Sequence, residues 1–444
     1  MSRDSFGSRL GALMALVGSA VGLGNFWKFP YMAGKNGGAV FILVYVLFMV
    51  ILCLPLMLSE FVIGRRSQSN PIGAFRKLAP GTKWFFTGLT GVVAAFVILS
   101  FYSVVGGWVI KYFVAAVFSG FSAQEGAATL FSTFSQSAVE PVIYHIVFLG
   151  LTMGIIIMGI KNGIEKWSKI LMPTLFVMIL FLAAYALCLP NAGAGVRFLL
   201  QPDFSQLTSA VVLDALGQGL FSLSLGMGAV ITYSSYMSKG ENLFKISLMT
   251  IGMDLGFALL AGFVIFPAVF SFGFAPDKGP GLLFTVLPQI FAQMSFGRIF
   301  AVVFFAVLII AALSSSISLL EVITTYATEE WKISRKKTVF LAGGAVTVLG
   351  ALCSLSLGCM GDVKIFGNII FDFFDKFSSI FLMPIGAFFI TLFVGWKMKR
   401  SAVFDELSNA NTLKVRYFKI IYFLIRYVVP IGIVIVFLNM LEVF

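Results

Sequence analysis

Charged residues are scarce in this chain of 444 residues, at 11% of the sequence, whereas soluble domains contain about 25%. Hydrophobic residues make up 59%, and the mean hydropathy is +1.00. This composition excludes a soluble globular enzyme, a disordered protein and a nucleic-acid binder. The net charge of +12 is therefore interpreted as a signal of membrane topology rather than as a surface for DNA.

The side chains that most often serve catalysis and metal binding are also scarce. His145 is the only histidine, which nearly excludes a histidine-based dyad or metal cage. The 4 cysteines form no Cys-x-x-Cys pair, so we expect neither a disulfide framework nor a zinc site. The motifs HExxH and GxSxG are absent, and so is a paired-carboxylate motif, so we expect no enzyme.

Long apolar runs dominate the rest of the sequence. A helix that crosses a bilayer needs ~20 mostly apolar residues, and eleven stretches meet this requirement. The first stretch lacks a small-residue cleavage site and contains polar residues, so we expect no cleavable signal peptide. The sequence therefore predicts an all-α polytopic membrane protein. The predicted spans lie near 8–32, 38–64, 84–119, 141–159, 167–189, 209–236, 243–272, 297–327, 337–356, 366–395 and 418–441.

The basic residues predict the orientation in the membrane. Most of the 31 lysines and arginines lie in one alternating set of connecting segments, and such segments usually face the cytoplasm. We therefore expect a cytoplasmic N-terminus, an external C-terminus after eleven spans, and a place in the cell (inner) membrane. The basic segments are the N-terminus, 65–83, 160–169, 237–245, 328–337 and 396–419.

The first and sixth spans combine glycine with small polar residues at mid-membrane. The first reads Gly-Ser-Ala-Val-Gly-Leu-Gly-Asn at 18–25, and the sixth reads Ser-Leu-Ser-Leu-Gly-Met-Gly at 222–228. Each glycine lowers helix stability by ~1 kcal/mol relative to alanine, so we expect both helices to break there. The glycines could instead allow close helix packing. Two matched stretches five spans apart favour a five-plus-five inverted repeat, with a binding site at the breaks.

A carboxylate and a group of hydroxyls lie at the same depth. Asp254 is in the seventh span, where inserting a charge costs roughly 2.5–3.5 kcal/mol, so we rank it first as a cation ligand and second as a proton carrier. Oxygen atoms near 18–25, 222 and 311–315 are the ligands that a hard cation such as sodium prefers. The serines at 314–316 could instead bond to their own helix backbone.

These motifs carry a resemblance to a known family. The matching runs are Arg9 to Gly11, Gly22 to Tyr31, Asn36 to Ala39, Gln218, Ser222 to Gly228 and Ser314 to Ser316. Over spans 1–10 the chain resembles the neurotransmitter:sodium symporter family. It is most similar to the bacterial members with eleven spans that carry hydrophobic or aromatic amino acids.

The resemblance implies a leucine-transporter-like fold, in which helices 1 and 6 are broken and an eleventh span is added. Residues 1–189 would form the first inverted repeat, 190–395 the second with the external loop 273–296 as a re-entrant segment or surface cap, and 396–444 the cytoplasmic linker and span 11. It implies sodium-coupled symport of a hydrophobic or aromatic L-amino acid into the cell by alternating access. The partners would be a free L-amino acid, sodium ions and the lipid bilayer.

The resemblance also implies a substrate site at the breaks. Tyr102, sodium and the amides of the first break would hold the substrate carboxylate. Related monoamine carriers have an aspartate at the position of Gly22, so its absence here implies free amino acids rather than amines. The implied substrate-binding residues are Ser19, Ala20, Gly22, Gly24, Ile98, Tyr102, Phe221, Ser222, Ser224, Met227, Ser318 and Leu319.

Two sodium sites are implied, and chloride is not expected. Asp254 would supply a fixed negative charge, and Ala258 replaces the serine with which chloride-dependent relatives hold the anion. The first site would use Ala20, Asn25, Ser222 and Asp254 together with the substrate carboxylate. The second would use Gly18, Val21, Ala311, Ser314 and Ser315.

Two gates are implied on either side of this site. Outside, Phe221 would cover the substrate and Lys28 would pair with Asp375, or with Asp372 one turn before it. Inside, Arg3 would pair with Glu329, supported by Tyr236. The alternative for each pair is an ordinary surface contact, worth ~0–1 kcal/mol.

Rival functions stay open at this point. A proton-coupled carrier of the same fold would use Asp254 as its proton site. A channel would need a continuous polar stripe along several helices, and a substrate-sensing receptor would need a soluble signalling extension. The residues leave open the preferred amino acid, the ion stoichiometry, the oligomeric state and the role of span 11.

Overall fold

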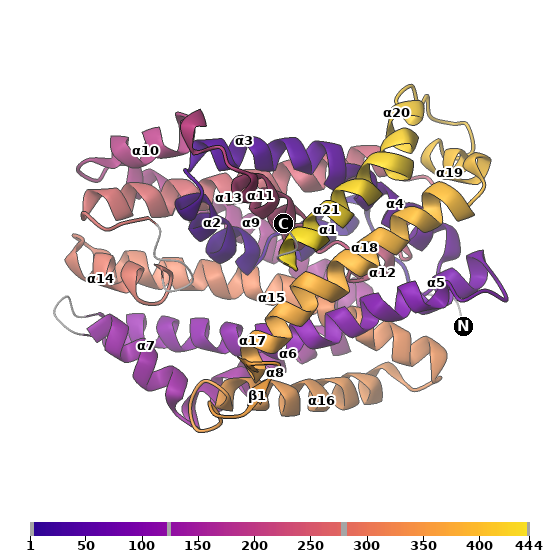
Figure 1. Cartoon of the computed structure of the whole chain (residues 1–444). Helices are drawn as coiled ribbons and strands as arrows, with labels where there is room; N and C mark the ends of the chain where they lie inside the picture. The colour runs from indigo at the N-terminus through magenta and orange to yellow at the C-terminus, as the bar shows by residue number, and fades with distance from the viewer. Residues whose placement is uncertain (1–3, 122–125, 277–281, 442–444) are drawn as a thin grey trace.

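The computed structural model describes residues 4–121, 126–276 and 282–441. Long helices lie side by side in a bundle, and shorter helices cover both of its ends (Figure 1). The only strands among the described residues are β1 (Lys364–Ile365) and β2 (Asn368–Ile369), which pair antiparallel. The all-α architecture predicted from the apolar runs is confirmed.

The eleven predicted spans all appear as helices. Nine described helices are long and apolar enough to cross a membrane, and a pair bent by 45° makes span 1 the tenth. Span 6 is the exception, because it consists of two shorter helices. In order, the spans are α1 (Arg9–Ala20) with the π-helix η1 (Gly24–Lys28) and α2 (Phe29–Lys35); α3 (Ala39–Phe48), η2 (Met49–Cys53) and α4 (Leu54–Ser67); α6 (Phe85–Phe118); α8 (Glu140–Ile157); η3 (Ile160–Glu165) and α9 (Lys166–Leu187); α11 (Ser209–Ser222) and α12 (Ala229–Ser234); α13 (Leu243–Ser271); α15 (Gly297–Glu330); α16 (Arg335–Leu355); α17 (Ile370–Lys376), η6 (Phe377–Leu382), α18 (Met383–Leu392) and η7 (Phe393–Lys397); and α20 (Phe418–Phe423), η8 (Leu424–Val428) and α21 (Val429–Met440).

Short helices lie in the connections between spans. In Figure 1, α5 and α19 lie at one end of the bundle, and α7, α10 and α14 lie at the other. The helix α14 falls within the external loop 273–296, and its buried apolar residues pack against α13 and α15. The connecting helices are α5 (Pro71–Leu78), α7 (Gly126–Gln136), α10 (Ala192–Leu200), η4 (Phe204–Gln206), α14 (Val286–Gln293) and α19 (Arg400–Leu407).

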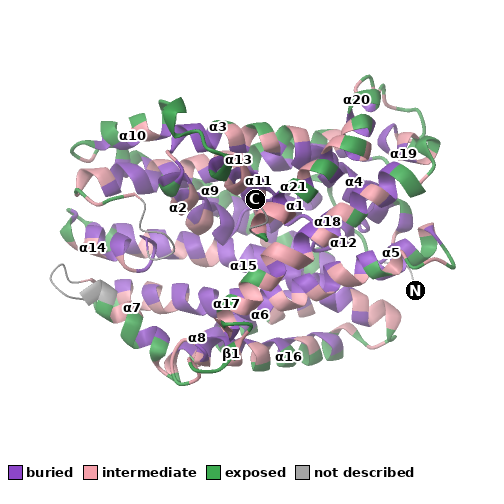
Figure 2. Cartoon of the chain, viewed as in Figure 1, coloured by how far each residue is buried: buried purple, intermediate pink, exposed green. Residues whose placement is uncertain are grey.

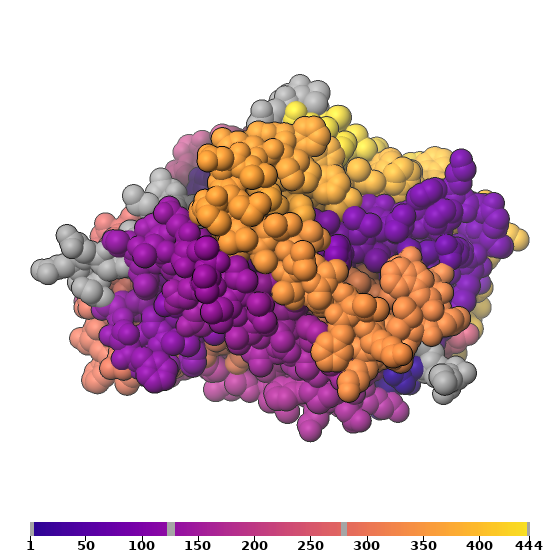
Figure 3. Space-filling model, turned by 90° about the horizontal axis from the view of Figure 1, so that it is seen from below, coloured from indigo at the N-terminus to yellow at the C-terminus, as the bar shows by residue number. Residues whose placement is uncertain are grey.

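The helices divide into a central and a peripheral group. In the most apolar stretch of α6 and of α15, 78% and 67% of the residues are buried, whereas in that of the span that contains α9 only 33% are buried. Figure 2 shows the buried residues along the middle of the bundle and the exposed ones toward its edges and ends. Figure 3 shows the lower face, where the purple segments near residues 85–157 adjoin the orange segments near 335–395. Because the outer helices expose large apolar side chains, that surface suits contact with lipid.

The two predicted helix breaks are present. The helix α1 ends at Ala20, and Val21 takes an extended conformation with ψ 102° before the chain re-enters a helix. In span 6, Ser224, Gly226 and Gly228 have φ values of 53°, 80° and 76°, which interrupt a right-handed helix. Glycine adopts such angles without steric cost, so the sequence between α11 and α12 is suited to an unwound stretch.

Candidate substrate and ion site

The unwound stretches of spans 1 and 6 expose backbone groups in the middle of the bundle, and side chains satisfy several of them. The amide of Gly22 donates to Asn25 Oδ1 at 3.0 Å, and the amide of Leu23 donates to the Tyr102 hydroxyl at 3.3 Å. In span 6, the amide of Gly226 donates to Glu60 Oε1 at 2.8 Å. These contacts hold a non-helical backbone in a bilayer interior, where unpaired polar groups are costly.

A second set of contacts joins the two breaks to each other. The Ser224 hydroxyl donates to the carbonyl of Ser19 at 2.9 Å, and Gln218 Nε2 donates to the carbonyl of Gly24 at 3.1 Å. Both donors belong to span 6 and both acceptors to span 1. The broken helices therefore form one unit around a shared centre.

Asp254 lies fully buried beside this centre. Asn25 Nδ2 donates to its Oδ1 at 2.7 Å, and the Ser222 hydroxyl lies 3.0 Å from both carboxylate oxygens. The Tyr45 hydroxyl donates to Oδ2 at 3.3 Å. The structure thus gathers three of the four side chains expected at the first sodium site, and the fourth residue, Ala20, lines the adjoining cavity. Sequence reasoning missed Tyr45.

The residues expected at the second sodium site also lie together. The Ser314 hydroxyl donates to the carbonyls of Val21 at 3.2 Å and of Ala311 at 2.9 Å. A Cβ added at Gly18 would lie 3.3 Å from the Cβ of Ser314, so a glycine there permits close approach. The Ser315 hydroxyl donates to the carbonyl of Ser19 at 3.3 Å. Hydroxyl and carbonyl oxygens of spans 1 and 8 therefore converge, as a hard cation requires.

Serines of span 8 also donate hydrogen bonds to carbonyls of their own helix, which is the alternative to ion binding given above for this segment. Ser316 donates to the carbonyl of Leu313 at 2.8 Å, and its hydroxyl lies 2.7 Å from that of Thr152 on α8, away from the breaks. Ser318 donates to the carbonyl of Ser315 at 2.8 Å. The serines of span 8 therefore have different surroundings.

A cavity lies between the breaks and the helices α6 and α15. All the residues expected to bind substrate line it except Ser318, and Leu23 and Ser315 line it in addition. Its volume is about 30 Å³, room for no more than a few water molecules, so a bulky side chain requires lining groups to move. The lining residues are Ser19, Ala20, Gly22, Leu23, Gly24, Ile98, Tyr102, Phe221, Ser222, Ser224, Met227, Ser315 and Leu319.

Gly22 leaves no room for a side chain. A Cβ added there would overlap the Ser315 hydroxyl and would lie 3.1 Å from the Tyr102 hydroxyl. An aspartate at this position would have to displace both groups. The local geometry therefore matches the absence of an acidic residue from the cavity.

Phe221, which lines the cavity, lies against Lys28. The Lys28 ammonium is 4.2 Å from the centre of the half-buried Phe221 ring, a cation–π contact. Lys28 and Asp375 interact electrostatically but lie farther apart than the 4.0 Å of an ion pair. Asp372 is exposed.

A separate ion pair lies between α2 of span 1 and α11 of span 6. Lys35 Nζ on α2 is 3.1 Å from Asp214 Oδ2 on α11, and Asn36 Nδ2 donates to the same oxygen at 3.0 Å. Sequence reasoning missed this contact because the partners lie on different helices, 179 residues apart.

On the inner side, Arg3 lies outside the described residues. Glu329 accepts hydrogen bonds from the backbone and side-chain amides of Asn70, at 2.8 and 2.9 Å. The Tyr236 hydroxyl donates to Glu321 at 2.7 Å, and Glu321 forms a two-pronged ion pair with Arg335. The buried Glu321 was absent from the residues expected at the inner gate.

Comparisons with known proteins agree with this geometry. The model of the sodium:neurotransmitter symporter family matches residues 3–129 and 136–444. An uncharacterized sodium-dependent transporter of Bacillus subtilis, YhdH, is 43% identical, over 98% of this chain and 97% of its own length. One from Haemophilus influenzae is 36% identical, over 98% of each chain.

A solved structure extends the likeness to three dimensions. The crystal structure of MhsT in complex with L-phenylalanine has a TM-score of 0.91 and 43% sequence identity, covering 99% of this chain and all of that one. The family match spans nearly the whole sequence, and the relatives are sodium-dependent transporters. This chain therefore belongs to the sodium:neurotransmitter symporter family and is a sodium-dependent, multi-pass membrane transporter.

Proposed function

We propose that this protein imports a hydrophobic or aromatic L-amino acid together with sodium ions, by alternating access and without chloride. The observation that carries the proposal is the buried Asp254, which lies with Asn25 and Ser222 directly beside the cavity between the broken helices. The related MhsT was crystallised with L-phenylalanine, which supports an amino-acid substrate.

The polar end of the substrate would lie against the break in span 1. The oxygen of Tyr102 accepts the Leu23 amide, which leaves its hydroxyl proton to bind the substrate carboxylate. The ammonium group would meet carbonyls of Ala20 and Phe221. The apolar side chain would lie against Ile98, Met227 and Leu319, which line the rest of the cavity.

Two sodium ions would bind beside the substrate. The first would lie among Ala20, Asn25, Ser222 and Asp254, and the second among Gly18, Val21, Ala311, Ser314 and Ser315. The fixed charge of Asp254 would replace the chloride that some relatives require. Ala258 supports this idea, because it is buried one turn away and its methyl group cannot bind an anion.

The gates belong to the same proposal. Outside, Phe221 would close over the substrate while Lys28 approaches Asp375. Inside, Glu329 would accept Arg3, with Tyr236 nearby. The end of the bundle that carries α5 and α19 would face the cytoplasm, because the connecting segments 65–83 and 396–419, to which these helices belong, are rich in lysine and arginine (Figure 1). The N-terminus would then lie in the cytoplasm and the C-terminus outside the inner membrane.

The test is binding of radiolabelled L-tryptophan to the purified protein in sodium gluconate or choline gluconate at fixed pH. We expect binding only with sodium, no further gain when chloride replaces gluconate, and competition by unlabelled L-phenylalanine and L-leucine. Equal binding in both salts would contradict sodium coupling. In that case, uptake driven by a pH gradient in proteoliposomes would support the rival proton carrier with Asp254 as its proton site.

A further inference from the structure

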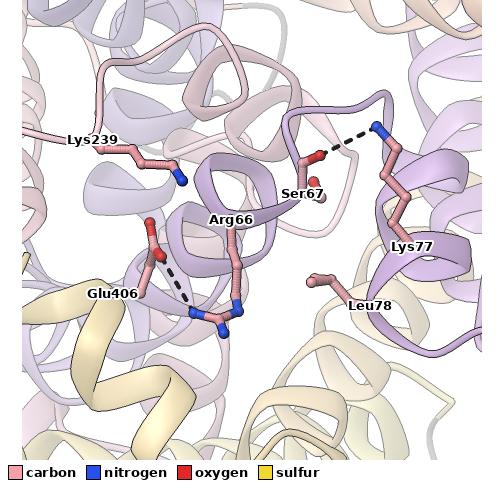
Figure 4. A pocket seen from close by; sticks show the side chains of 6 residues that line it. All are labelled: Arg66, Ser67, Lys77, Leu78, Lys239 and Glu406. Carbon is pink, nitrogen blue, oxygen red and sulfur yellow. Dashed lines mark hydrogen bonds and ion pairs between the residues drawn. The ribbon is translucent and has the colours of Figure 1, made fainter. Parts of the chain in front are cut away.

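A hollow at the end of the bundle opposite α10 and α14 is lined by three cations from three segments. Its volume is about 360 Å³, within the range of roughly 300–1,000 Å³ of ligand pockets. Figure 4 shows Arg66, Lys77 and Lys239 around the same opening. Arg66 ends α4, Lys77 lies on α5 and Lys239 lies between α12 and α13; Ser67, Leu78 and Glu406 complete the lining.

The positive charge of this hollow is only partly balanced. Its one carboxylate, Glu406, is 3.7 Å from Arg66, but it also pairs at 2.6 Å with the buried Arg65. Among the described residues, the ammonium groups of Lys77 and Lys239 have no carboxylate within 4.0 Å. Lys77 instead donates to the carbonyl of Ser67 at 3.4 Å.

The arrangement suits a group with several anionic oxygens. The guanidinium of Arg66 can bind two oxygens in one plane, whereas the two ammonium groups act as point charges from other directions. Arg66 is also the second-last residue of the span Ala39–Ser67, so the hollow lies at the depth of lipid headgroups. Leu78 adds one apolar side chain to the lining.

We propose that this hollow binds a phosphate group, which in the membrane belongs to an anionic phospholipid. The bound group would bridge α4, α5 and the segment before α13. Next to it, Arg65 on α4 already donates hydrogen bonds to Glu406 on α19 and to the carbonyl of Glu241 before α13. It would stabilise the inner ends of spans 2 and 7 and the linker between spans 10 and 11. None of the three cations lines the central cavity, so this site is separate from the proposed transport site.

The test compares the full chain with Arg66→Gln/Lys77→Gln/Lys239→Gln in phosphatidylcholine nanodiscs that contain phosphatidylglycerol. Native mass spectrometry measures retained phosphatidylglycerol, and thermal unfolding measures stabilisation by the lipid. A basic residue that contacts the bound phosphate contributes about fivefold in affinity, so the triple variant should lose retention on the order of a hundredfold. The matched control is Lys332→Gln/Lys336→Gln/Lys337→Gln, three exposed lysines beyond the hollow, which should retain the lipid.

Two further measurements separate a loss of lipid binding from a loss of folding, and a lipid headgroup from free phosphate. The single variant Lys239→Gln changes an exposed side chain, so it should fold normally and lose about fivefold. Inorganic phosphate added to nanodiscs of phosphatidylcholine alone distinguishes a lipid headgroup from free phosphate. If phosphate stabilises the wild type but not the triple variant, the hollow binds a free phosphate group. Equal responses of the wild type and both variants to phosphatidylglycerol and to phosphate would overturn the proposal.

Discussion

The side-chain amide of Asn25 donates a hydrogen bond of 2.7 Å to the carboxylate of Asp254, 229 residues further along the chain. The same carboxylate accepts the hydroxyls of Ser222 and Tyr45. The break of span 1, the break of span 6 and the middle of span 7 therefore meet at one buried carboxyl group. Because an unpaired charge in a membrane interior is costly, a cation at the proposed sodium site would balance this group when it is ionised.

Replacing that carboxylate with an amide should change the ion requirement. The variant Asp254→Asn keeps the shape of the side chain but removes its charge, so sodium affinity should fall by about tenfold or more, or a chloride requirement should appear. Sodium titrations of L-tryptophan binding, with chloride or gluconate as the anion, measure both effects. Unchanged sodium affinity without chloride dependence would show that the charge plays no part.

The neighbouring alanine offers a matched second variant. Asp254→Asn/Ala258→Ser adds a hydroxyl one turn away, where chloride-dependent relatives carry a serine. If the charge and the anion are interchangeable, chloride should raise sodium affinity in this double variant more than in Asp254→Asn. Asp362→Asn serves as the control, because this aspartate is exposed and lies outside the cluster and the gates.

Removing one hydroxyl should weaken substrate binding. Tyr102→Phe eliminates the donor proposed for the substrate carboxylate, and a hydrogen bond to a charged group contributes about 1.5–3 kcal/mol, or roughly 10- to 100-fold in affinity. Tyr112→Phe is the control on the same helix, because its hydroxyl has no hydrogen-bond partner among the described atoms. Equal affinity of both variants would place the carboxylate elsewhere.

The breaks and the residues around them were predictable because polar groups are rare in this sequence. In spans 1 and 6, glycine and serine stand out against an apolar background, and the positive φ angles of Gly226 and Gly228 in span 6 are ones that glycine adopts without steric cost. The resemblance then directed attention to a small set of residues. All of the expected cavity residues except Ser318 line one space in the structure.

The contacts between distant helices were not predictable in the same way. Tyr45, Glu321 and the pair Lys35–Asp214 carry no local signal, because each partner lies on another helix and helix packing decides which faces meet. Ser318 shows that the residues lining the cavity were also hard to predict within a single helix. It lies three residues after Ser315 on the same helix, yet only Ser315 lines the cavity, whereas the Ser318 hydroxyl donates to the Ser315 carbonyl.

The size of the cavity should determine which amino acids are carried. Met227 is buried and its side chain lines the cavity, so a larger side chain at this position competes with the substrate for the same space. Met227→Phe adds volume to a small space, and overpacking costs typically 1–3 kcal/mol. Uptake of L-tryptophan into proteoliposomes should therefore fall about tenfold relative to L-leucine. An unchanged ratio would contradict this placement of the substrate side chain.

A buried ion pair should contribute to stability at the inner end of the bundle. Glu321 has a fully buried side chain, accepts hydrogen bonds from Tyr236 and Thr325, and pairs with Arg335. Glu321→Gln leaves the arginine without its counter-charge, and breaking a buried pair from one side costs about 3–5 kcal/mol.

Thermal unfolding in detergent measures this loss, and an exposed pair supplies the comparison. Arg76 and Glu330 have side chains that are 54% and 22% exposed, so Arg76→Gln should cost less than about 1 kcal/mol. Glu321→Gln/Arg335→Gln should recover part of the loss, because neither partner then carries an uncompensated charge. If Glu321→Gln unfolds at the temperature of the wild type, the pair with Arg335 contributes nothing to stability.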